Sequence, residues 1–285
     1  KRMTLTIGDD VFDLSGIWQY AVTAEADRDC PFEDFVRWKP TGLYNAMLAP
    51  CFPYAVRAVL WYQGESNTGD YAMRYGDELK AMIKLWRGKW HQPDMPFLIV
   101  QLPKFGIDAI EDGGWPLIRE QEWRVADELE HVAAVVTLDA GESNDLHPHD
   151  KKTIADRAFN VAMDFVYGQQ AQPQPVVETA EADDGLLRMH CVWRNSMGEQ
   201  MQSQNRHLMT LDGDVPREID FLWHDCATSV RAEAWLDGCD IVARIPSRMP
   251  DEVRYAWSNS PESGLICDGD GVLLPPFHLP LPMVD

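Results

Sequence analysis

The regular alternation of short apolar runs with amphipathic helical segments constrains the fold of this chain more than any other feature of its sequence. Three mostly apolar runs have the length of buried strands, at residues 55–62, 96–103 and 131–139. Each run precedes a segment whose apolar side chains recur at the spacing of one helix face, at residues 75–86, 117–129 and 154–165. Strands that alternate with amphipathic helices form a parallel sheet with crossover helices. The sequence therefore predicts an α/β layer structure over the first 170 residues.

The sequence changes character near residue 170. Residues 169–175 are polar and rich in proline, which is typical of a linker. Beyond them the pattern indicates short strands separated by turn residues, and no helix of normal length is predicted. Apolar and polar residues alternate over 230–236, and an apolar run returns at 241–245, which predicts a β-hairpin. We therefore predict two domains, an α/β domain at residues 1–170 and an antiparallel β-rich module at residues 171–285.

Charge and hydropathy argue against several classes of partner. The chain carries 46 acidic and 25 basic residues, a net charge of −21, and such an acidic excess repels nucleic-acid phosphates. Hydrophobic residues make up 45% of the chain, which is enough for a packed core. No apolar run approaches the ~20 residues of a membrane-spanning helix, and the first residues show no signal-peptide core. We expect no nucleic-acid or membrane partner. Without a visible signal peptide the location leans towards the cytoplasm, but it stays open because the chain does not begin with Met.

The six cysteines are widely spaced and form no C-x-x-C pair. A zinc knuckle or a thioredoxin-type motif is therefore unsupported. A chain of this length builds its core without disulfides, so we expect mostly buried free thiols.

A glycine loop follows the first predicted strand, at the carboxyl end where open α/β sheets place ligands. Gly64 allows backbone N–H groups to approach a ligand closely, and the side-chain amide of Gln63 offers a second donor. Two donors of this kind are what an oxyanion hole requires. A tight turn with a solvated Glu65 is the alternative, because the same Gly-Glu-Ser-Asn letters recur at residues 141–144.

A second loop, residues 144–151, follows the third predicted strand and combines acidic and histidine residues. A carboxylate beside a histidine orients the imidazole and stabilises its charged form in general-base catalysis. Positions two apart in an extended segment share a face, so we expect Asp145 to meet His147. Two alternatives stay open: a metal site that adds His149 and Asp150, and simple capping of the following helix. No distant His or Cys cluster completes a ligand set, so we expect no metal and no cofactor.

Several short motifs occur in an order that resembles one enzyme family. They are Leu43-Tyr44-Asn45-Ala46-Met47-Leu48-Ala49-Pro50, Trp61-Tyr62-Gln63-Gly64-Glu65-Ser66-Asn67, Arg119-Glu120-Gln121, Asp145-Leu146-His147-Pro148 and Val253-Arg254-Tyr255-Ala256-Trp257. The ordered set covers nearly the whole chain from residue 40 onward and is similar to the sialate O-acetylesterases, which are SGNH-type hydrolases. The resemblance implies an SGNH-hydrolase-like (flavodoxin-like) parallel sheet with helices on both faces, followed by a smaller antiparallel β module. Residues 1–170 would then be the C-terminal part of the catalytic domain of a carbohydrate O-acetylesterase.

The resemblance also implies roles for the two loops. His147 would be the catalytic base of a Ser–His–Asp arrangement, with Asp145 as the acid that orients it. Many SGNH hydrolases place this acid three residues before the histidine, where this chain has an asparagine, so a Ser–His dyad stays open. Gln63 and Gly64 would supply the oxyanion donors, and Glu65 would brace their loop.

The family's nucleophile has no counterpart among the first residues of this chain. It is a serine in a Gly-Gln-Ser-Asn block, and in residues 1–60 the nearest serine, Ser15, lacks that pattern. The resemblance therefore implies a second chain or segment that carries the nucleophilic serine, besides an O-acetylated sugar as substrate. Ser66 as an unusual nucleophile is the alternative within this chain. Hydrolysis of O-acetyl groups of sialic acid by serine acyl transfer is the leading hypothesis; its rivals are an acetyl-xylan or other glycan esterase and a non-catalytic carbohydrate-binding subunit.

Overall fold

The computed structural model describes residues 4–18, 21, 39–106, 114–169, 172–202, 206–226 and 228–281. The chain forms two compact units, Lys1–Cys51 and Phe52–Asp285. None of the helices in the described segments has both the length and the apolar character needed to cross a bilayer.

The first unit contains a small hairpin and a short helical segment. β1 (Thr4–Ile7) and β2 (Asp10–Asp13) pair antiparallel, and Gly8 in their turn has a φ of +62°, which favours glycine. A π-helical turn (Tyr44–Leu48) continues into a 3-10 turn (Ala49–Cys51). Every residue of the two strands is exposed, so this hairpin does not form a core of its own.

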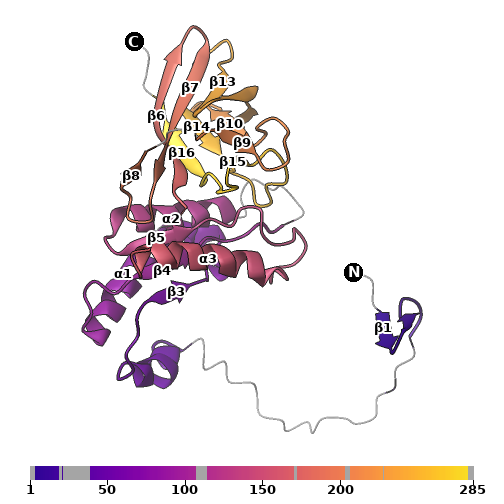
Figure 1. Cartoon of the computed structure of the whole chain (residues 1–285), viewed down its shortest axis with the longest axis vertical. Helices are drawn as coiled ribbons and strands as arrows, with labels where there is room; N and C mark the ends of the chain where they lie inside the picture. The colour runs from indigo at the N-terminus through magenta and orange to yellow at the C-terminus, as the bar shows by residue number, and fades with distance from the viewer. Residues whose placement is uncertain are drawn as a thin grey trace. The chain divides into compact units, whose positions relative to one another are not determined.

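Three parallel strands form the first sheet of the second unit (Figure 1). They are β3 (Val59–Trp61), β4 (Phe97–Val100) and β5 (Val132–Val135), in the order β3-β4-β5. All four residues of the central strand β4 are buried, which explains why its sequence is a continuous apolar run rather than an alternation. Each strand lies inside one of the predicted apolar runs, so the three predicted strands are confirmed.

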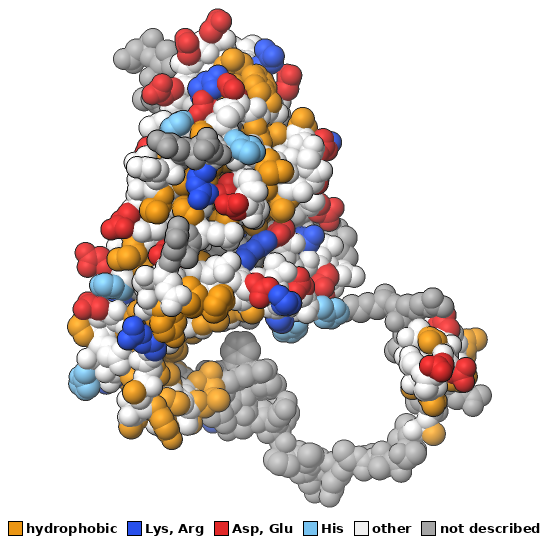
Figure 2. All heavy atoms as spheres, in the orientation of Figure 1, with side chains coloured by type: hydrophobic (Ala, Val, Ile, Leu, Met, Phe, Trp, Pro, Cys, Tyr) orange, Lys and Arg blue, Asp and Glu red, His pale blue; other side chains and the backbone are white. Residues whose placement is uncertain are grey.

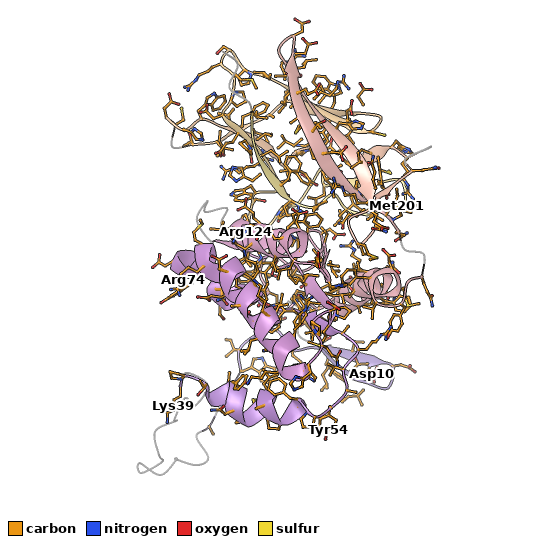
Figure 3. The ribbon with its side chains drawn as sticks, turned by 90° about the vertical axis from the view of Figure 1, so that its left-hand side faces the viewer. Asp10, Lys39, Tyr54, Arg74, Arg124 and Met201 are labelled. Atoms are coloured by element: carbon orange, nitrogen blue, oxygen red, sulfur yellow. The ribbon has the colours of Figure 1, made fainter. Side chains whose placement is uncertain are left out.

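Helices cover both faces of this sheet. They are α1 (Ala72–Trp90), α2 (Trp115–Glu128) and α3 (Lys151–Phe165). Alternate residues of β4 face opposite sides: Phe97 and Ile99 pack in the core with α1 and α2, whereas Leu98 and Val100 pack with α3. Figure 3, in which Arg74 marks α1 and Arg124 marks α2, shows these two helices on one side of the unit. The predicted parallel sheet with helices on both faces is therefore confirmed.

Antiparallel sheets make up the rest of the second unit (Figure 1). One sheet joins β12 (Ala234–Asp237), β13 (Asp240–Arg244), β7 (Leu186–Arg194) and β6 (Gln174–Asp183), with β8 (Gln200–Met201) on β7. Another joins β11 (Val230–Arg231), β10 (Ile219–Leu222), β14 (Glu252–Tyr255) and β16 (Phe277–Pro280), and β15 (Ile266–Asp268) pairs with β9 (Leu208–Thr210). In the described segments no α-helix follows α3, as the sequence predicts.

The β-rich part and the α/β layers share one hydrophobic cluster. Trp193 and Tyr255 are fully buried in a cluster that also includes Val136 and Leu138, which follow β5. Truncating a buried Trp or Phe to Ala costs about 3–5 kcal/mol, so this cluster fastens the two parts to each other. The boundary between residues 170 and 171 stays a prediction; the first strand beyond it, β6, begins at Gln174.

The β-hairpin predicted from residues 230–245 has a first strand that is shorter than the alternation over 230–236 predicts. β12 and β13 pair with Asp237 opposite Asp240, across the two-residue turn that begins with Gly238. Val230, near the start of the predicted first strand, lies instead in β11 and pairs with Phe221 of β10 in the other sheet. The prediction of one long strand is therefore wrong. Alternation does not reveal this change of sheet, because inward-facing residues stay apolar in both sheets.

The five described cysteines are free thiols. Cys191 and Cys267 are buried, and burial raises their pKa to about 12 and about 11. Cys51 and Cys226 are exposed, so the expectation of buried thiols is wrong for these two. Cys30 lies outside the described residues.

The acidic excess is not gathered into one patch on the face that Figure 2 shows. Acidic and basic side chains are interspersed there over both the helices and the β-rich part. Several of them are paired, as in the bonds from Arg157 to Asp139 and from Arg188 to Asp240. Exposed pairs, such as Arg188 with Asp237, contribute little stability, about 0–1 kcal/mol each.

Candidate active site

The two candidate loops lie at the carboxyl end of the parallel sheet. Residues 62–65 follow β3 directly, and residues 136–149 connect β5 to α3. The Lys151 ammonium at the start of α3 lies 5.0 Å from the centre of the Tyr62 ring, so the two loops approach each other. The sequence places both loops at this edge, because parallel strands end at the same edge of a sheet, although β4 lies between β3 and β5.

Gly64 is required by packing against α2. A Cβ atom at this position would lie 2.8 Å from Cγ2 of Ile118 and 3.4 Å from Cδ1 of Leu102. The 3-10 turn that follows, Glu65–Asn67, is closed by the Asn67 N–H, which donates to the Gly64 carbonyl at 2.9 Å. The loop after β3 is therefore pressed onto α2 with no room for a side chain at its glycine.

Gln63 is held at both its backbone and its side chain. Its Nε2 donates to Oδ1 of Asn67 at 2.9 Å, and its carbonyl accepts the Tyr75 hydroxyl at 2.5 Å. Burial raises the pKa of Tyr75, so its hydroxyl keeps its proton and donates. One N–H of the Gln63 amide thus holds the loop, and the amide has a second N–H to offer a ligand.

Glu65 is bonded to the predicted oxyanion donor. The backbone N–H of Gly64 donates to Oε2 of Glu65 at 2.9 Å. This contact braces the turn in the way that the sequence predicts for Glu65. It also means that an anion binds to the Gly64 N–H only after the Glu65 carboxylate has moved away.

Glu122 lies beneath this loop, and the sequence gives no sign of its role. It is fully buried in α2, its Oε2 accepts the Leu102 N–H at 3.0 Å, and its Oε1 has no partner among the described residues. A Cβ on Gly64 would lie 3.2 Å from that Oε1 atom. Burial raises the pKa of Glu122 well above its usual range, which favours the neutral acid over the carboxylate at this position.

The second loop brings Asp145 to two histidines in different ways. Asp145 closes a turn by donating its N–H to the Glu142 carbonyl at 3.2 Å. Its Oδ1 accepts the backbone N–H of His147 at 3.1 Å, and its Oδ2 lies 3.3 Å from Nε2 of His149. The segment is a turn, so the expectation of an extended backbone is wrong. Asp side chains commonly accept the N–H two residues ahead in such turns.

His149 lies between two carboxylates. Its Nδ1 lies 3.7 Å from Oε1 of Glu142, on the other side from Asp145, and its backbone N–H donates to Oε2 of Glu142 at 3.2 Å. Both His147 and His149 are exposed. Among the described residues, no group of three or more His, Cys, Asp or Glu side chains could hold a metal ion. Sequence reasoning considered His149 only as a metal ligand and missed its contact with Asp145.

Asp150 caps α3. Its carboxylate accepts the backbone N–H of Thr153 at 3.0 Å and the Thr153 hydroxyl at 2.5 Å. These bonds hold the pKa of Asp150 below its usual value. Asp150 therefore has the helix-capping role that the sequence left open, whereas Asp145 contacts the two histidines of its own loop.

Arg119 joins the site to the β-rich part, and sequence reasoning assigned it no role. It is fully buried and donates to four backbone carbonyls. Two of them, Leu102 and Pro103, are in the loop after β4 at 2.7 and 2.9 Å. The other two, Ser258 and Asn259, are in the β-rich part at 2.8 and 3.0 Å. In an amphipathic helix, a charged residue is ordinarily assigned to the face that contacts solvent. For this reason sequence reasoning missed both Arg119 and Glu122, which lies one helical turn later.

Comparison with known proteins identifies relatives of this chain. A family model described as "Carbohydrate esterase, sialic acid-specific acetylesterase" matches residues 33–157, which contain both loops. The sialate O-acetylesterase of Mus musculus is 30% identical over 264 residues, covering 82% of this chain and 47% of the mouse protein. That of Rattus norvegicus is 25% identical with the same coverage. The crystal structure of a carbohydrate acetylesterase from Xanthomonas citri matches with a TM-score of 0.73 at 29% identity, covering 83% of this chain and 53% of that one. The chain thus spans about half the length of the relatives it matches.

Proposed function

The chain belongs to the sialate O-acetylesterase family of carbohydrate esterases, and on this basis we propose that it forms the part of a carbohydrate O-acetylesterase that carries the general base and the oxyanion donors. Its fold is SGNH-hydrolase-like, as the sequence resemblance implies. The substrate that we propose is an O-acetyl ester of sialic acid, the sugar in the name of the mammalian relatives.

One observation carries this proposal. The loop with Gln63 and Gly64 and the loop with Asp145 and His147 lie at the same end of the sheet, and Lys151 spans from one to the other. Acyl transfer needs a base and an oxyanion site on either side of one reacting carbonyl. The arrangement supplies both from the ends of β3 and β5, the two strands that flank β4.

The proposed reaction follows from these positions. His147 takes the proton from a serine hydroxyl, whose oxygen attacks the acetyl carbonyl carbon. The Gly64 N–H and the Gln63 amide receive the negative charge that develops on the carbonyl oxygen. The ester bond to the sugar breaks, and His147 returns the proton to the departing sugar oxygen. Water, activated by His147, then releases acetate from the acetyl-serine.

The nucleophilic serine belongs, in this proposal, to a segment or second chain that pairs with the open edge of β3. Among the described residues β3 pairs only with β4, and Leu60 in β3 is 58% exposed. A further parallel strand at this edge would end beside the Gln63–Glu65 loop. A serine that follows such a strand would reach the carbonyl held between Gly64 and His147. Open strand edges with apolar side chains invite pairing of this kind.

Covalent labelling tests this proposal. We expect the 285-residue chain alone to release no acetate from p-nitrophenyl acetate and to resist a fluorophosphonate probe. Addition of the serine-bearing polypeptide should restore both, with the label on that polypeptide. Labelling of the isolated chain at Ser66 would instead place the nucleophile here. An assembled complex that binds O-acetylated sugars without hydrolysing them would refute the enzyme and leave a carbohydrate-binding subunit.

The choice of sugar is tested with matched substrates. The Xanthomonas relative is named only as a carbohydrate acetylesterase, so other acetylated glycans remain candidate substrates. We expect a higher kcat/KM for O-acetylated sialic acid than for acetylated xylan. The reverse order would assign the chain to acetyl-xylan or a similar glycan.

A further inference from the structure

Two cysteines lie opposite each other where β13 meets β7 (Figure 1). Asp240 opposite His190 is the last registered pair of these two strands. One position beyond it, Cys239 faces Cys191, whose N–H donates to the Cys239 carbonyl at 3.0 Å. Opposite residues of a hydrogen-bonded antiparallel pair have Cα atoms about 5.5 Å apart. That separation is within the range of about 4.4–6.8 Å that disulfides span.

Both cysteine side chains lie on the face of the sheet that packs in the core. Cys191 follows Leu187 and Met189 on the buried face of β7. Cys239 is partly buried and packs against the same hydrophobic cluster. The two thiols are also close enough for charge on one to affect the other, because a negative charge on Cys239 raises the pKa of Cys191. The two thiols are therefore neighbours on one side of the sheet.

The two thiols differ in their access to solvent. Cys191 is 1% exposed, whereas Cys239 is partly exposed, in the two-residue turn between β12 and β13. The Cys239 thiol donates to the Arg206 carbonyl at 3.4 Å, a weak bond that a reaction at the sulfur can break. A dissolved oxidant therefore reaches Cys239 first, and Cys191 reacts only with a group already attached there. Redox-active cysteine pairs divide into an accessible and a resolving thiol in this way.

We propose that Cys191 and Cys239 form a reversible disulfide between β7 and the β12–β13 turn, by exchange with a low-molecular-weight disulfide such as oxidised glutathione. The Cys239 thiolate attacks one sulfur of the glutathione disulfide, forms a mixed disulfide and releases the first glutathione thiolate. The Cys191 thiolate then attacks the Cys239 sulfur, and the second glutathione leaves as a thiolate. The two cysteines lose two protons and two electrons, and glutathione disulfide takes them up to become two glutathione thiols. This modification does not depend on the proposed esterase function.

The backbone geometry makes such a disulfide strained and therefore easily reduced. Cβ atoms of opposite residues are about 4.5–5.5 Å apart in antiparallel pairs, whereas a disulfide needs about 3.5–4.5 Å. Cys239 follows Gly238, which has a φ of +64°, so the turn can bring it the missing ~1 Å closer to β7 while Asp237 and Asp240 stay paired. Strained disulfides form in an oxidising environment and open in a reducing one. The free thiols of the structure are thus the reduced state of this pair.

The disulfide would close a loop of about 50 residues that includes strands of both larger antiparallel sheets. Between the two cysteines the chain passes through β10 and β11, which belong to the sheet that does not contain β7. Cross-linking the ends of such a loop removes many conformations from the unfolded chain. In a unit of this size we expect oxidation to raise Tm by about 10 °C.

Peptide mapping of the oxidised, folded 285-residue chain tests the proposal. The chain is incubated with glutathione disulfide and quenched, free thiols are alkylated in denaturant, and proteolytic peptides are weighed without reduction. We expect one linked peptide that contains Cys191 and Cys239, a Tm about 10 °C higher, and loss of both after dithiothreitol. The mixed disulfide should close about tenfold faster for each pH unit between about pH 7 and 9, because the thiolate is the nucleophile and burial raises the pKa of Cys191 to about 12.

Single substitutions separate the roles of the two thiols. Cys191→Ala should stop at a stable mixed disulfide, with one glutathione on Cys239 and no rise in Tm. Cys239→Ala should leave Cys191 unmodified, because no oxidant reaches it; this variant also covers the case in which Cys191→Ala, in the core, fails to fold. Cys226→Ala, at an exposed position after β10, is the matched control and should keep both the linked peptide and the rise in Tm.

Three results would overturn the proposal. One is glutathione that stays on Cys239 of the wild-type chain while Cys191 is recovered in its alkylated form. Another is a disulfide that joins Cys239 to a different cysteine. The third is a linked Cys191–Cys239 peptide that forms only in denaturant, because the folded backbone then keeps the two thiols apart.

Discussion

Replacing Gly64 with alanine is the most direct test of the site's packing, and this chain alone suffices for it. The added Cβ would lie 2.8 Å from Cγ2 of Ile118, whereas carbon atoms in contact are about 3.5–4.0 Å apart. Ile118 has no exposed surface and lies inside α2, so its side chain has nowhere to turn. Either the loop after β3 or α2 must therefore shift by roughly 1 Å.

Overpacking of this size costs about 1–3 kcal/mol. The midpoint of thermal or urea unfolding measures it directly, and in a unit of this size each kcal/mol lowers Tm by about 2–4 °C. Gly88→Ala in α1 is the matched control, because a Cβ there meets nothing within 4 Å. That change should stabilise the chain by about 0.5–1 kcal/mol, the difference between Gly and Ala in a helix.

A double substitution shows whether the loss comes from Ile118. Ile118→Ala removes Cγ2 and creates a cavity, with a cost of about 2–5 kcal/mol by itself. In Gly64→Ala combined with Ile118→Ala, the new methyl group enters that cavity, so the combined loss should be smaller than the sum. Additive losses, or a Gly64→Ala chain as stable as the wild type, would refute the packing argument.

Three further predictions concern the chemistry and its pH dependence. In the complete enzyme, His147→Ala should lower kcat by at least ~10²-fold and leave Tm nearly unchanged, because the side chain is exposed; activity within a few-fold of wild type would remove it from the mechanism. Gln63→Ala should lower kcat by roughly 10²–10³-fold at nearly constant KM; a raised KM at constant kcat would make it a substrate-binding residue. Glu120, 3.3 Å from Nδ1 of His278, and Glu252 raise the pKa of His278 above 6.5. Its contribution to stability is therefore complete below about pH 6.5 and is lost as the pH rises through the raised pKa; His278→Gln should flatten this part of the Tm–pH curve, and an unchanged slope would contradict the assignment.

The strands and helices of the α/β layers were predictable because burial on both faces leaves a plain pattern. β4 is apolar at every residue since α1 and α2 cover one face and α3 the other. The spacing of apolar residues likewise predicts the three helices. Both candidate loops follow from the same reasoning, because strand ends determine where they lie.

Sequence reasoning missed charged residues that are buried because a segment distant in the sequence covers their helix. Arg119 and Glu122 are charged residues of α2, yet both are fully buried. Arg119 is covered by residues 258 and 259, about half the chain away in sequence, and Glu122 lies beneath Gly64. Local periodicity contains no information on such contacts. The turn at Asp145 was missed for a related reason: a short polar side chain can bond its own backbone, and this competes with an extended conformation.

The bond between the Glu65 carboxylate and the Gly64 N–H has a consequence for the energetics of acyl transfer. The donor is already bonded to an anion at rest, so an oxyanion would exchange with one negative group rather than fill an empty site. The rate would then gain only the difference between two charge-assisted bonds at this N–H, not the whole of one. In return, the surrounding dipoles are oriented for negative charge before substrate arrives, and they need not reorganise when the charge on the acetyl oxygen appears. A carboxylate that competes with the transition state would thus keep the resting site polarised for it.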